Sequence, residues 1–165
     1  MLLFGKDLEL LDTIPGVGRC TAEQILAEIR TDMNQFSPAA HICSWAGLSP
    51  GSNESARKRN SERTRKGNKK PRGALVEVAR AADRTKNTYL SSQYHRFAAR
   101  RGKSRAAVTV AHSILTISYY IVKRKQPYIE LGPTYYEERK RDAVLKQSIK
   151  KLESLGYEVT VESVA

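Results

Sequence analysis

Residues 103–124, KSRAAVTVAHSILTISYYIVKR, are the most apolar stretch of the sequence and decide its fold. Their apolar side chains recur at the spacing of one helix face, over about six turns at ~3.6 residues per turn. The positions on this face are Ala107, Val110, Ala111, Ile114, Leu115, Ser118 and Ile121. We predict a central core helix around which the rest of the chain packs. His112 lies close to the same face, and we interpret it as a core histidine rather than a catalytic base.

Further helices are predicted on both sides of this stretch. They cover residues 6–13, 19–30, 38–47, 68–84, 88–101 and 134–155. The alternation of residues 156–164 is typical of a strand, and Pro127 and Gly132 with Pro133 break the chain before the last helix. The sequence therefore predicts an all-α fold, with a compact multi-helix domain at 1–126 and a C-terminal extension at 127–165 that ends in a candidate strand. Because the chain enters a helix almost at once, we expect a fragment of a longer protein, or an engineered or degenerate start.

A strongly basic loop, residues 47–67, separates two of the predicted helices. Nine Lys and Arg residues lie from Arg57 to Arg72 and only Glu62 opposes them, so this part carries a net +8 of the chain's +12. A loop of about twenty residues is long for a compact domain, and such loops are usually functional or disordered. Lys69, Lys70 and Arg72 also crowd the first turn of the next helix, where the helix dipole disfavours cations unless an anion docks there.

The overall charge indicates the class of partner. A pI near 9.9 is typical of a nucleic-acid binder, whereas a membrane-surface helix would need an apolar stripe opposite its basic residues. No run reaches the roughly 18 apolar residues of a membrane span. The sequence has no P-loop, no paired carboxylates in a predicted pocket and no His or Cys cluster, so we predict no metal site in this chain. We interpret Cys20 and Cys43 as reduced, buried thiols, and His41 as a surface or core-edge histidine.

Residues 6–30 read as a helix, a Gly-x-Gly turn and a second helix, which is the pattern of a helix-hairpin-helix. The turn is IPGVG, residues 14–18. Gly16 and Gly18 allow positive φ and close approach of the backbone, so N–H groups at the start of the second helix could grip a phosphate without reading sequence. The alternative is a tight structural turn between two packed helices.

Several blocks of the sequence, in their order and spacing, resemble one known family. They are IPGVGRCTAEQILAEI at 14–29, WAGLSPGSNESA at 45–56, RTRKGN at 63–68, RGALVEVARAA at 72–82 and RGKSRAAVTVAHSIL at 101–115. The pattern is similar to the C-terminal transposase domain of insertion-sequence family one-ten. Members of that family are serine-plus-DEDD transposases, and some are recombinases guided by a bridge RNA. The similarity covers about residues 10–125, and the segments LGPTYYEER and LESLGYEV near the end also fit.

This resemblance implies a serine recombination reaction. A serine in the N-E-S-A block attacks a DNA phosphate and forms a phosphoserine link, and the matching position here is Ser55. The family binds Mg²⁺ through four acidic residues of an N-terminal RNase-H-like domain, which we expect to be missing from this chain. The chain is then the serine half of a composite site, expected to be unable to cut or join DNA alone. The partners implied are DNA, a guide RNA in some members and, in the full-length protein, further copies of the chain. The location implied is the nucleoid-associated cytoplasm of a bacterium or archaeon.

The residues expected to touch nucleic acid lie in the Gly-x-Gly turn, the basic loop and a second basic patch before the core helix. They are Gly16, Gly18, Arg57, Lys58, Arg59, Arg63, Arg65, Lys66, Asn68, Arg101 and Lys103. Two alternatives come from other classes of protein. A non-catalytic helix-hairpin-helix module would bind DNA or RNA without chemistry at Ser55. A structural oligomerisation domain would associate through the narrow apolar stripe of helix 134–155, formed by Val144, Leu145, Ile149 and Leu152.

Overall fold

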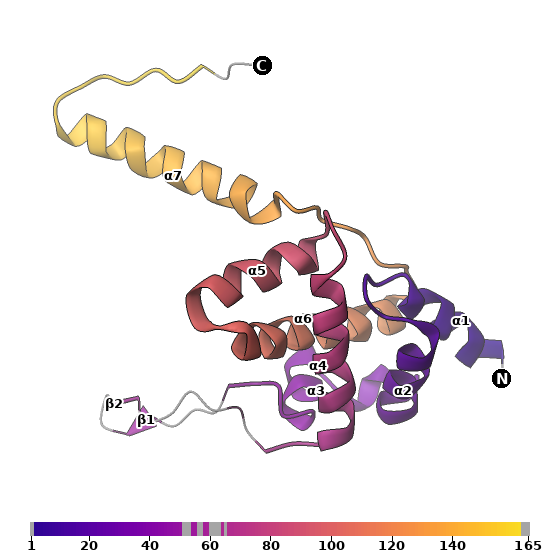
Figure 1. Ribbon diagram of the computed structural model, residues 1–165. Helices are drawn as coiled ribbons and strands as arrows, with labels where there is room; N and C mark the ends of the chain where they lie inside the picture. The colour runs from indigo at the N-terminus through magenta and orange to yellow at the C-terminus, as the bar shows by residue number, and fades with distance from the viewer. Residues whose placement is uncertain (1, 51–53, 56–57, 60–63, 65, 163–165) are drawn as a thin grey trace.

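The computed structural model describes residues 2–50, 54–55, 58–59, 64 and 66–162 (Figure 1). Within these residues the chain forms seven α-helices and one short 3₁₀ helix, so the prediction of an all-α fold is confirmed. The elements are α1 (Leu2–Asp12), α2 (Arg19–Ile29), η1 (Met33–Gln35), α3 (Ala39–Trp45), β1 (Glu54–Ser55), β2 (Lys58–Arg59), α4 (Lys69–Asp83), α5 (Tyr89–Arg101), α6 (Lys103–Arg124) and α7 (Tyr135–Ser154).

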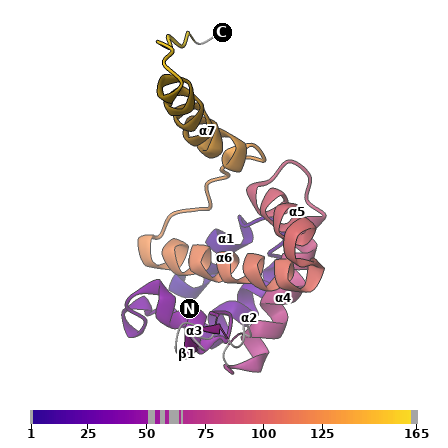
Figure 2. The same ribbon diagram turned by 90° about the vertical axis from the view of Figure 1, so that its left-hand side faces the viewer.

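Helix α6 is the central helix of the body, with the bounds that the sequence predicts. All seven residues of its predicted apolar face are buried. It packs against α1, α3, α4 and α5, and Figure 2 shows it crossing the body among them. Its length and apolar composition alone would suffice to cross a membrane, but more than half of its most apolar window is buried inside the protein. This is the arrangement of a core helix.

The flanking helices bury the faces that their periodicity predicts. On α2 the buried positions are Ala22, Ile25, Leu26 and Ile29, and on α4 they include Leu75, Val78, Ala79 and Ala82. The residues before α4 and α5 fix where these helices begin. Asn68 Oδ1 accepts a hydrogen bond from the N–H of Lys70 at 3.2 Å, and Thr88 Oγ1 accepts one from the N–H of Ser91 at 3.2 Å. Such N-caps satisfy N–H groups that have no partner within the helix.

Three sequence predictions are corrected by the structure. Residues 157–162 form no strand, because the two described strands, β1 and β2, pair with each other and leave these residues no partner. The basic loop has short secondary structure, since β1 and β2 pair as antiparallel strands within it. Cys43 is buried as expected, but Cys20 is exposed. It lies two residues before buried Ala22 on α2, which turns it about 200° away from the core.

A buried carboxylate ties the first helix to the end of the core helix. Asp7 on α1 is fully buried, and both of its carboxylate oxygens lie 2.7 Å from Nζ of Lys125, directly after α6. About half of the Lys125 side chain is exposed. A buried carboxylate is stable in the fold only while its cationic partner remains, because without that partner nothing offsets the free energy of removing the charge from water.

Replacing Lys125 by Met is expected to lower the free energy of unfolding by about 3 kcal/mol, because it leaves Asp7 buried without a partner. Urea unfolding followed by circular dichroism measures the change. The control is Lys6→Met at an exposed neighbouring position, which should stay within about 0.5 kcal/mol. The double variant Asp7→Leu/Lys125→Met should recover most of the loss. Equal stability of the Lys125 and Lys6 variants would show that the ion pair does not hold the two helices together.

Helix α7 stands away from the helical body (Figures 1 and 2). None of its residues is buried, and Val144, Leu145 and Leu152 of its predicted apolar stripe are exposed. Its first turn is attached to α5 by aromatic packing. The Tyr89 ring lies 5.2 Å from that of Tyr135 and 5.3 Å from that of Tyr136, and the Tyr89 and Tyr136 hydroxyls are 2.8 Å apart.

Candidate nucleic-acid interface

Residues 47–67, here called the basic arm, leave and rejoin the helical body at one point. A Cβ on Gly67 would clash with the backbone N and Cα of Gly47 and lie 2.6 Å from the carbonyl oxygen of Trp45. The next residue, Asn68, donates its backbone N–H to the same carbonyl at 3.0 Å. The two ends of the basic arm are therefore in backbone contact, and only a glycine fits at position 67.

The described parts of the basic arm form a narrow antiparallel ribbon. Pro50 pairs with Thr64 in an isolated bridge, and further out Glu54 pairs with Arg59 and Ser55 with Lys58. Figure 1 shows β1 and β2 well away from the helices, at the end of the projecting arm. Ser55 is the last residue of β1, and its backbone pairs with that of Lys58 in β2.

Several of the predicted contact residues of the basic arm can be placed only in part. Arg57, Arg63 and Arg65 lie outside the described residues, and Ser55, Lys58 and Arg59 are described by their strand positions alone. Lys66 is exposed at the base of the basic arm. The roles of all six basic residues, and of Ser55, stay predictions.

Asn68 has a structural role at the base of the basic arm. Besides capping α4, its side chain donates from Nδ2 to Oε2 of Glu28 on α2 at 3.0 Å. Together with the backbone bond to Trp45, these contacts connect the start of α4 to both α2 and α3. A contact between Asn68 and nucleic acid stays a prediction, and it would have to coexist with this network.

The two glycines of the α1–α2 turn have different surroundings. Gly16 has a φ of +88°, and a Cβ there would lie 2.7 Å from the backbone N of Ala82 on α4. Glycine is thus required at position 16 by close packing within the chain. Gly18 is exposed and precedes α2, and no described side chain caps this helix. Gly18 therefore lies beside the uncapped N-terminus of α2, although phosphate binding there stays a prediction.

The second basic patch lies where α5 turns into α6. Arg101 ends α5 and Lys103 begins α6, with Gly102 between them at a φ of +86°. Both side chains are exposed. The patch adjoins a pocket of about 350 Å³ that Lys103 lines together with Arg80, Asp83, Arg84, Tyr94 and Ser104. Within it, Oδ1 of Asp83 lies 3.0 Å from Nε2 of His95.

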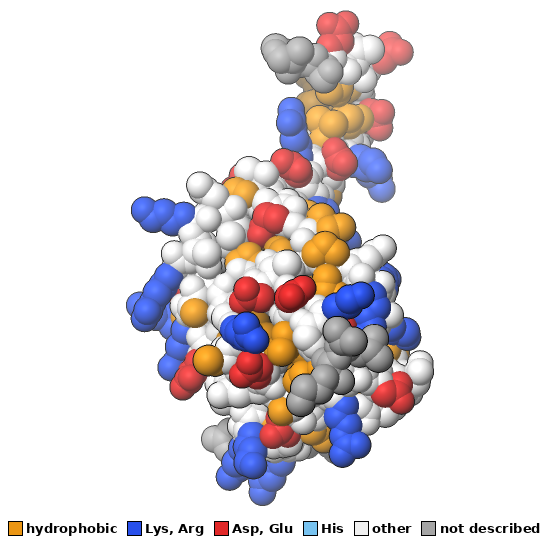
Figure 3. Space-filling view, turned by 90° about the vertical axis from the view of Figure 1, so that its right-hand side faces the viewer, with side chains coloured by type: hydrophobic (Ala, Val, Ile, Leu, Met, Phe, Trp, Pro, Cys, Tyr) orange, Lys and Arg blue, Asp and Glu red, His pale blue; other side chains and the backbone are white. Residues whose placement is uncertain are grey.

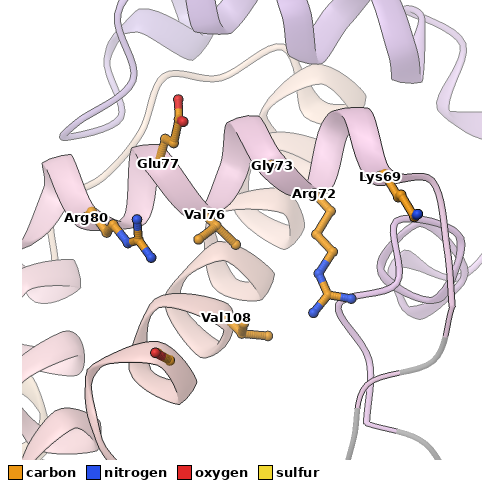
Figure 4. A pocket seen from close by; sticks show the side chains of 8 residues that line it. Lys69, Arg72, Gly73, Val76, Glu77, Arg80 and Val108 are labelled. Atoms are coloured by element: carbon orange, nitrogen blue, oxygen red, sulfur yellow. The ribbon is translucent and has the colours of Figure 1, made fainter.

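A groove between α4 and the first turns of α6 contains residues that the sequence reasoning missed. Its volume is about 420 Å³, and its lining is Lys69, Arg72, Gly73, Val76, Glu77, Arg80, Ser104 and Val108 (Figure 4). Lys69 and Arg72 were singled out from the sequence, but Arg80, Ser104 and Val108 were not. The signal available was the spacing of Arg72, Val76 and Arg80, four residues apart on one face of a helix.

Acidic and basic side chains are mixed on one face of the body. Figure 3 shows the face on the side opposite to the basic arm, where Asp and Glu side chains lie among Lys and Arg. Lys69, Arg72 and Arg80 lie on α4, the helix that follows the basic arm in the chain. Within the described residues, no group of three or more His, Cys, Asp or Glu side chains could hold a metal ion.

The described groups with perturbed pKa values lie outside the basic arm. Burial lowers the pKa of His112, and burial raises the pKa of the Cys43 thiol, with an opposing contribution from the hydrogen bond to Thr116. Burial also raises the pKa values of Tyr89 and Tyr128, near the start of α7. These are shifts of groups packed inside the fold, and none of the four lies in the basic arm or in the α4–α6 groove.

Comparison with known proteins finds relatives among DNA-rearranging enzymes. The profile of the transposase IS116/IS110/IS902 family matches residues 8–96. Two curated proteins, each named pilin gene-inverting protein, come from Moraxella bovis and Moraxella lacunata. Each is 30% identical to this chain over 123 residues, which is 72% of the chain and 38% of the relative. The chain thus spans less than half the length of these relatives.

Proposed function

This chain belongs to the IS116/IS110/IS902 family of transposases, and on that premise we propose that it is the DNA-binding and DNA strand-joining domain of an insertion-sequence transposase. The family and the pilin gene-inverting relatives support an enzyme of DNA recombination that acts on DNA. The observation that carries the finer proposal is the position of Ser55, which pairs with Lys58 in a strand pair that lies away from the helical body.

The proposed reaction is a two-step exchange of phosphodiester bonds. In the first step the Ser55 oxygen loses its proton and attacks a DNA phosphorus. The bond between this phosphorus and one deoxyribose oxygen breaks, and the deoxyribose oxygen takes up a proton and leaves as a hydroxyl group. In the second step a hydroxyl of another DNA end attacks the phosphoserine, and the serine oxygen recovers its proton. The number of phosphodiester bonds is conserved, so the exchange needs no external energy source.

The cations of the basic arm are proposed to hold the phosphate that reacts. Guanidinium and ammonium groups stabilise the charge that develops on the non-bridging oxygens in phosphoryl transfer. Arg57, Lys58, Arg59, Arg63, Arg65 and Lys66 supply this charge near Ser55 in the sequence. Gly18, Arg101 and Lys103 would contact the backbone of the same DNA further along the body.

The remaining parts of the active site are proposed to lie in the rest of the full-length transposase. A charged group that activates the Ser55 hydroxyl is needed, and the described residues of this chain offer no cluster that fits Mg²⁺. As the family resemblance implies, we propose that Mg²⁺ is held by an N-terminal RNase-H-like domain. In this proposal residues 1–126 are the C-terminal transposase domain and residues 127–165 its extension. The full-length protein is a homo-oligomer in the bacterial or archaeal cytoplasm, with a guide RNA as a further partner.

Trapping of a covalent intermediate tests the proposal. A full-length transposase that carries this segment is incubated with a DNA substrate nicked beside the exchange site, so that the released short strand diffuses away and the second step cannot occur. Protease digestion and mass spectrometry should then identify a nucleotide attached to Ser55. DNA binding without any covalent adduct would favour the non-catalytic binding module, and an adduct on Ser52 or Ser61 would assign the nucleophile to another serine of the basic arm.

A further inference from the structure

We infer that the α4–α6 groove, lined by Lys69, Arg72, Gly73, Val76, Arg80, Ser104 and Val108, binds the sugar–phosphate backbone of the DNA that the basic arm engages. The inference rests on the proposed function, because it names a second contact surface for the same DNA. Nothing in the sequence resemblance assigns a role to Arg80, Val76 or Val108.

The positive charge of the groove is not neutralised by the described part of the chain. Among the described residues, no carboxylate lies within ion-pair distance of Lys69, Arg72 or Arg80. Glu77 is the acidic residue of the lining, and Figure 4 shows its carboxylate directed away from the guanidinium groups of Arg72 and Arg80. Several cations gathered in one groove repel each other, and a polyanion relieves this repulsion.

The position of these cations fits an extended ligand better than a single anion. Arg72 and Arg80 are eight residues apart on α4, which separates their Cα atoms by roughly 12 Å along the helix. Successive phosphates of one DNA strand advance by about 3.4 Å along the duplex axis. The two guanidinium groups would therefore contact different phosphates, as the backbone contacts that position DNA commonly do.

The floor of the groove is apolar and has few large side chains. Val76 of α4 and Val108 of α6 are half-buried between the cations, and Figure 4 shows both side chains at the bottom of the groove. Gly73 adds no side chain, and apart from its chain neighbours and the nearby backbone of α4, no described atom lies within 4 Å of where its Cβ would be. Such a strip can accept the apolar face of deoxyribose while phosphates lie toward the Arg side chains.

The groove continues directly from the base of the basic arm. Lys69 is the first residue of α4 and lies two positions after Gly67, where the basic arm rejoins the body. A strand lying along the groove would thus run toward the arm that carries Ser55. At its other end the groove shares Arg80 and Ser104 with the adjoining pocket, which Arg84 and Lys103 extend. The groove therefore begins beside the base of the basic arm, where Lys66 is also exposed.

The salt dependence of DNA binding tests this inference. The affinity of this chain for a short duplex is measured by fluorescence anisotropy at several NaCl concentrations, for the wild type and for Arg72→Gln/Arg80→Gln. Each lost phosphate contact reduces the slope of log K against log salt by about 0.9. We therefore expect the double variant to show a slope smaller in magnitude by about 1.8, equally for unrelated DNA sequences.

The matched control removes two positive charges from α7. Lys140→Gln/Lys146→Gln changes exposed positions outside the groove and should leave the slope close to that of the wild type. Circular dichroism verifies that the variants are folded. If the double variant is unstable, Arg80→Gln alone replaces it, because Arg80 is exposed. This single variant should reduce the slope of log K against log salt by about 0.9.

The outcomes separate this inference from the function on which it rests. If the groove variants and the α7 variants have the wild-type slope while the wild type binds DNA, the groove inference is overturned and the proposed function stands. If the wild-type chain binds no DNA, the proposed function fails with it. A slope change seen only with single-stranded RNA would overturn the assignment of the groove to DNA.

Discussion

A full-length transposase carrying Ser55→Ala is expected to lose strand exchange by at least about a thousandfold, because removal of a nucleophilic oxygen leaves no atom to form the covalent intermediate. Its affinity for DNA should remain that of the wild type, since the substitution removes no charge and the basic arm retains its cations. Strand exchange is measured by the appearance of recombinant DNA, and binding by anisotropy on the same DNA.

The controls for this prediction are Ser52→Ala and Ser61→Ala, two serines of the same basic arm. Both variants should keep strand exchange and binding, because neither hydroxyl is assigned a bond to phosphorus. If Ser55→Ala recombines DNA at the wild-type rate, the segment acts as a binding module and the nucleophile must be sought elsewhere in the transposase.

Replacing Gly67 by Ala is expected to destabilise the protein by about 3 kcal/mol, because the new methyl group would overlap the backbone of Gly47 and crowd the Trp45 carbonyl. These neighbours are backbone atoms, so the clash cannot be relieved by rotating a side chain. The two ends of the basic arm must move apart, which also disturbs the bond from Asn68 to Trp45. Thermal and urea unfolding of the isolated chain measure the loss.

Gly73→Ala is the matched control, since position 73 lies within α4 and its added methyl group would meet no described atom within 4 Å beyond its chain neighbours and the nearby backbone of α4. Alanine is a better helix former than glycine, so this variant should be as stable as the wild type or more stable by up to about 1 kcal/mol. A Gly67→Ala variant with wild-type stability would mean that the two ends of the basic arm do not meet as described.

The helical body could be predicted from the sequence because its determinants are local. The apolar positions of α6, such as Val110 and Ile114, recur at the helical period, and the structure buries them. The bounds of α4 and α5 follow from residues that cap or precede each helix, Asn68 and Thr88 among them. The transposase family could also be predicted from the sequence, because several sequence blocks between residues 14 and 115 have the order and spacing that the family shows.

Contacts between distant residues could not be predicted in this way. Asp7 and Lys125 are 118 positions apart, and no local pattern marks either residue as the partner of the other. The α4–α6 groove likewise joins Arg72 and Arg80 to Ser104 and Val108 from another helix. Gly67 gave no signal because its need for glycine comes from Gly47, twenty positions earlier in the chain. The pairing of β1 with β2 was missed because the ribbon is polar and shows no alternation of apolar and polar residues.

Because its two ends are in contact, the basic arm is an insertion whose length does not affect the helices on either side. The backbones of Gly47 and Gly67 are in contact. The packing of the helices therefore does not depend on how many residues lie between these two glycines. Closing a longer loop adds little entropic cost once its ends are fixed. We therefore expect that a basic arm of another length would fit the same helical body, provided that its two ends keep Gly47 and Gly67.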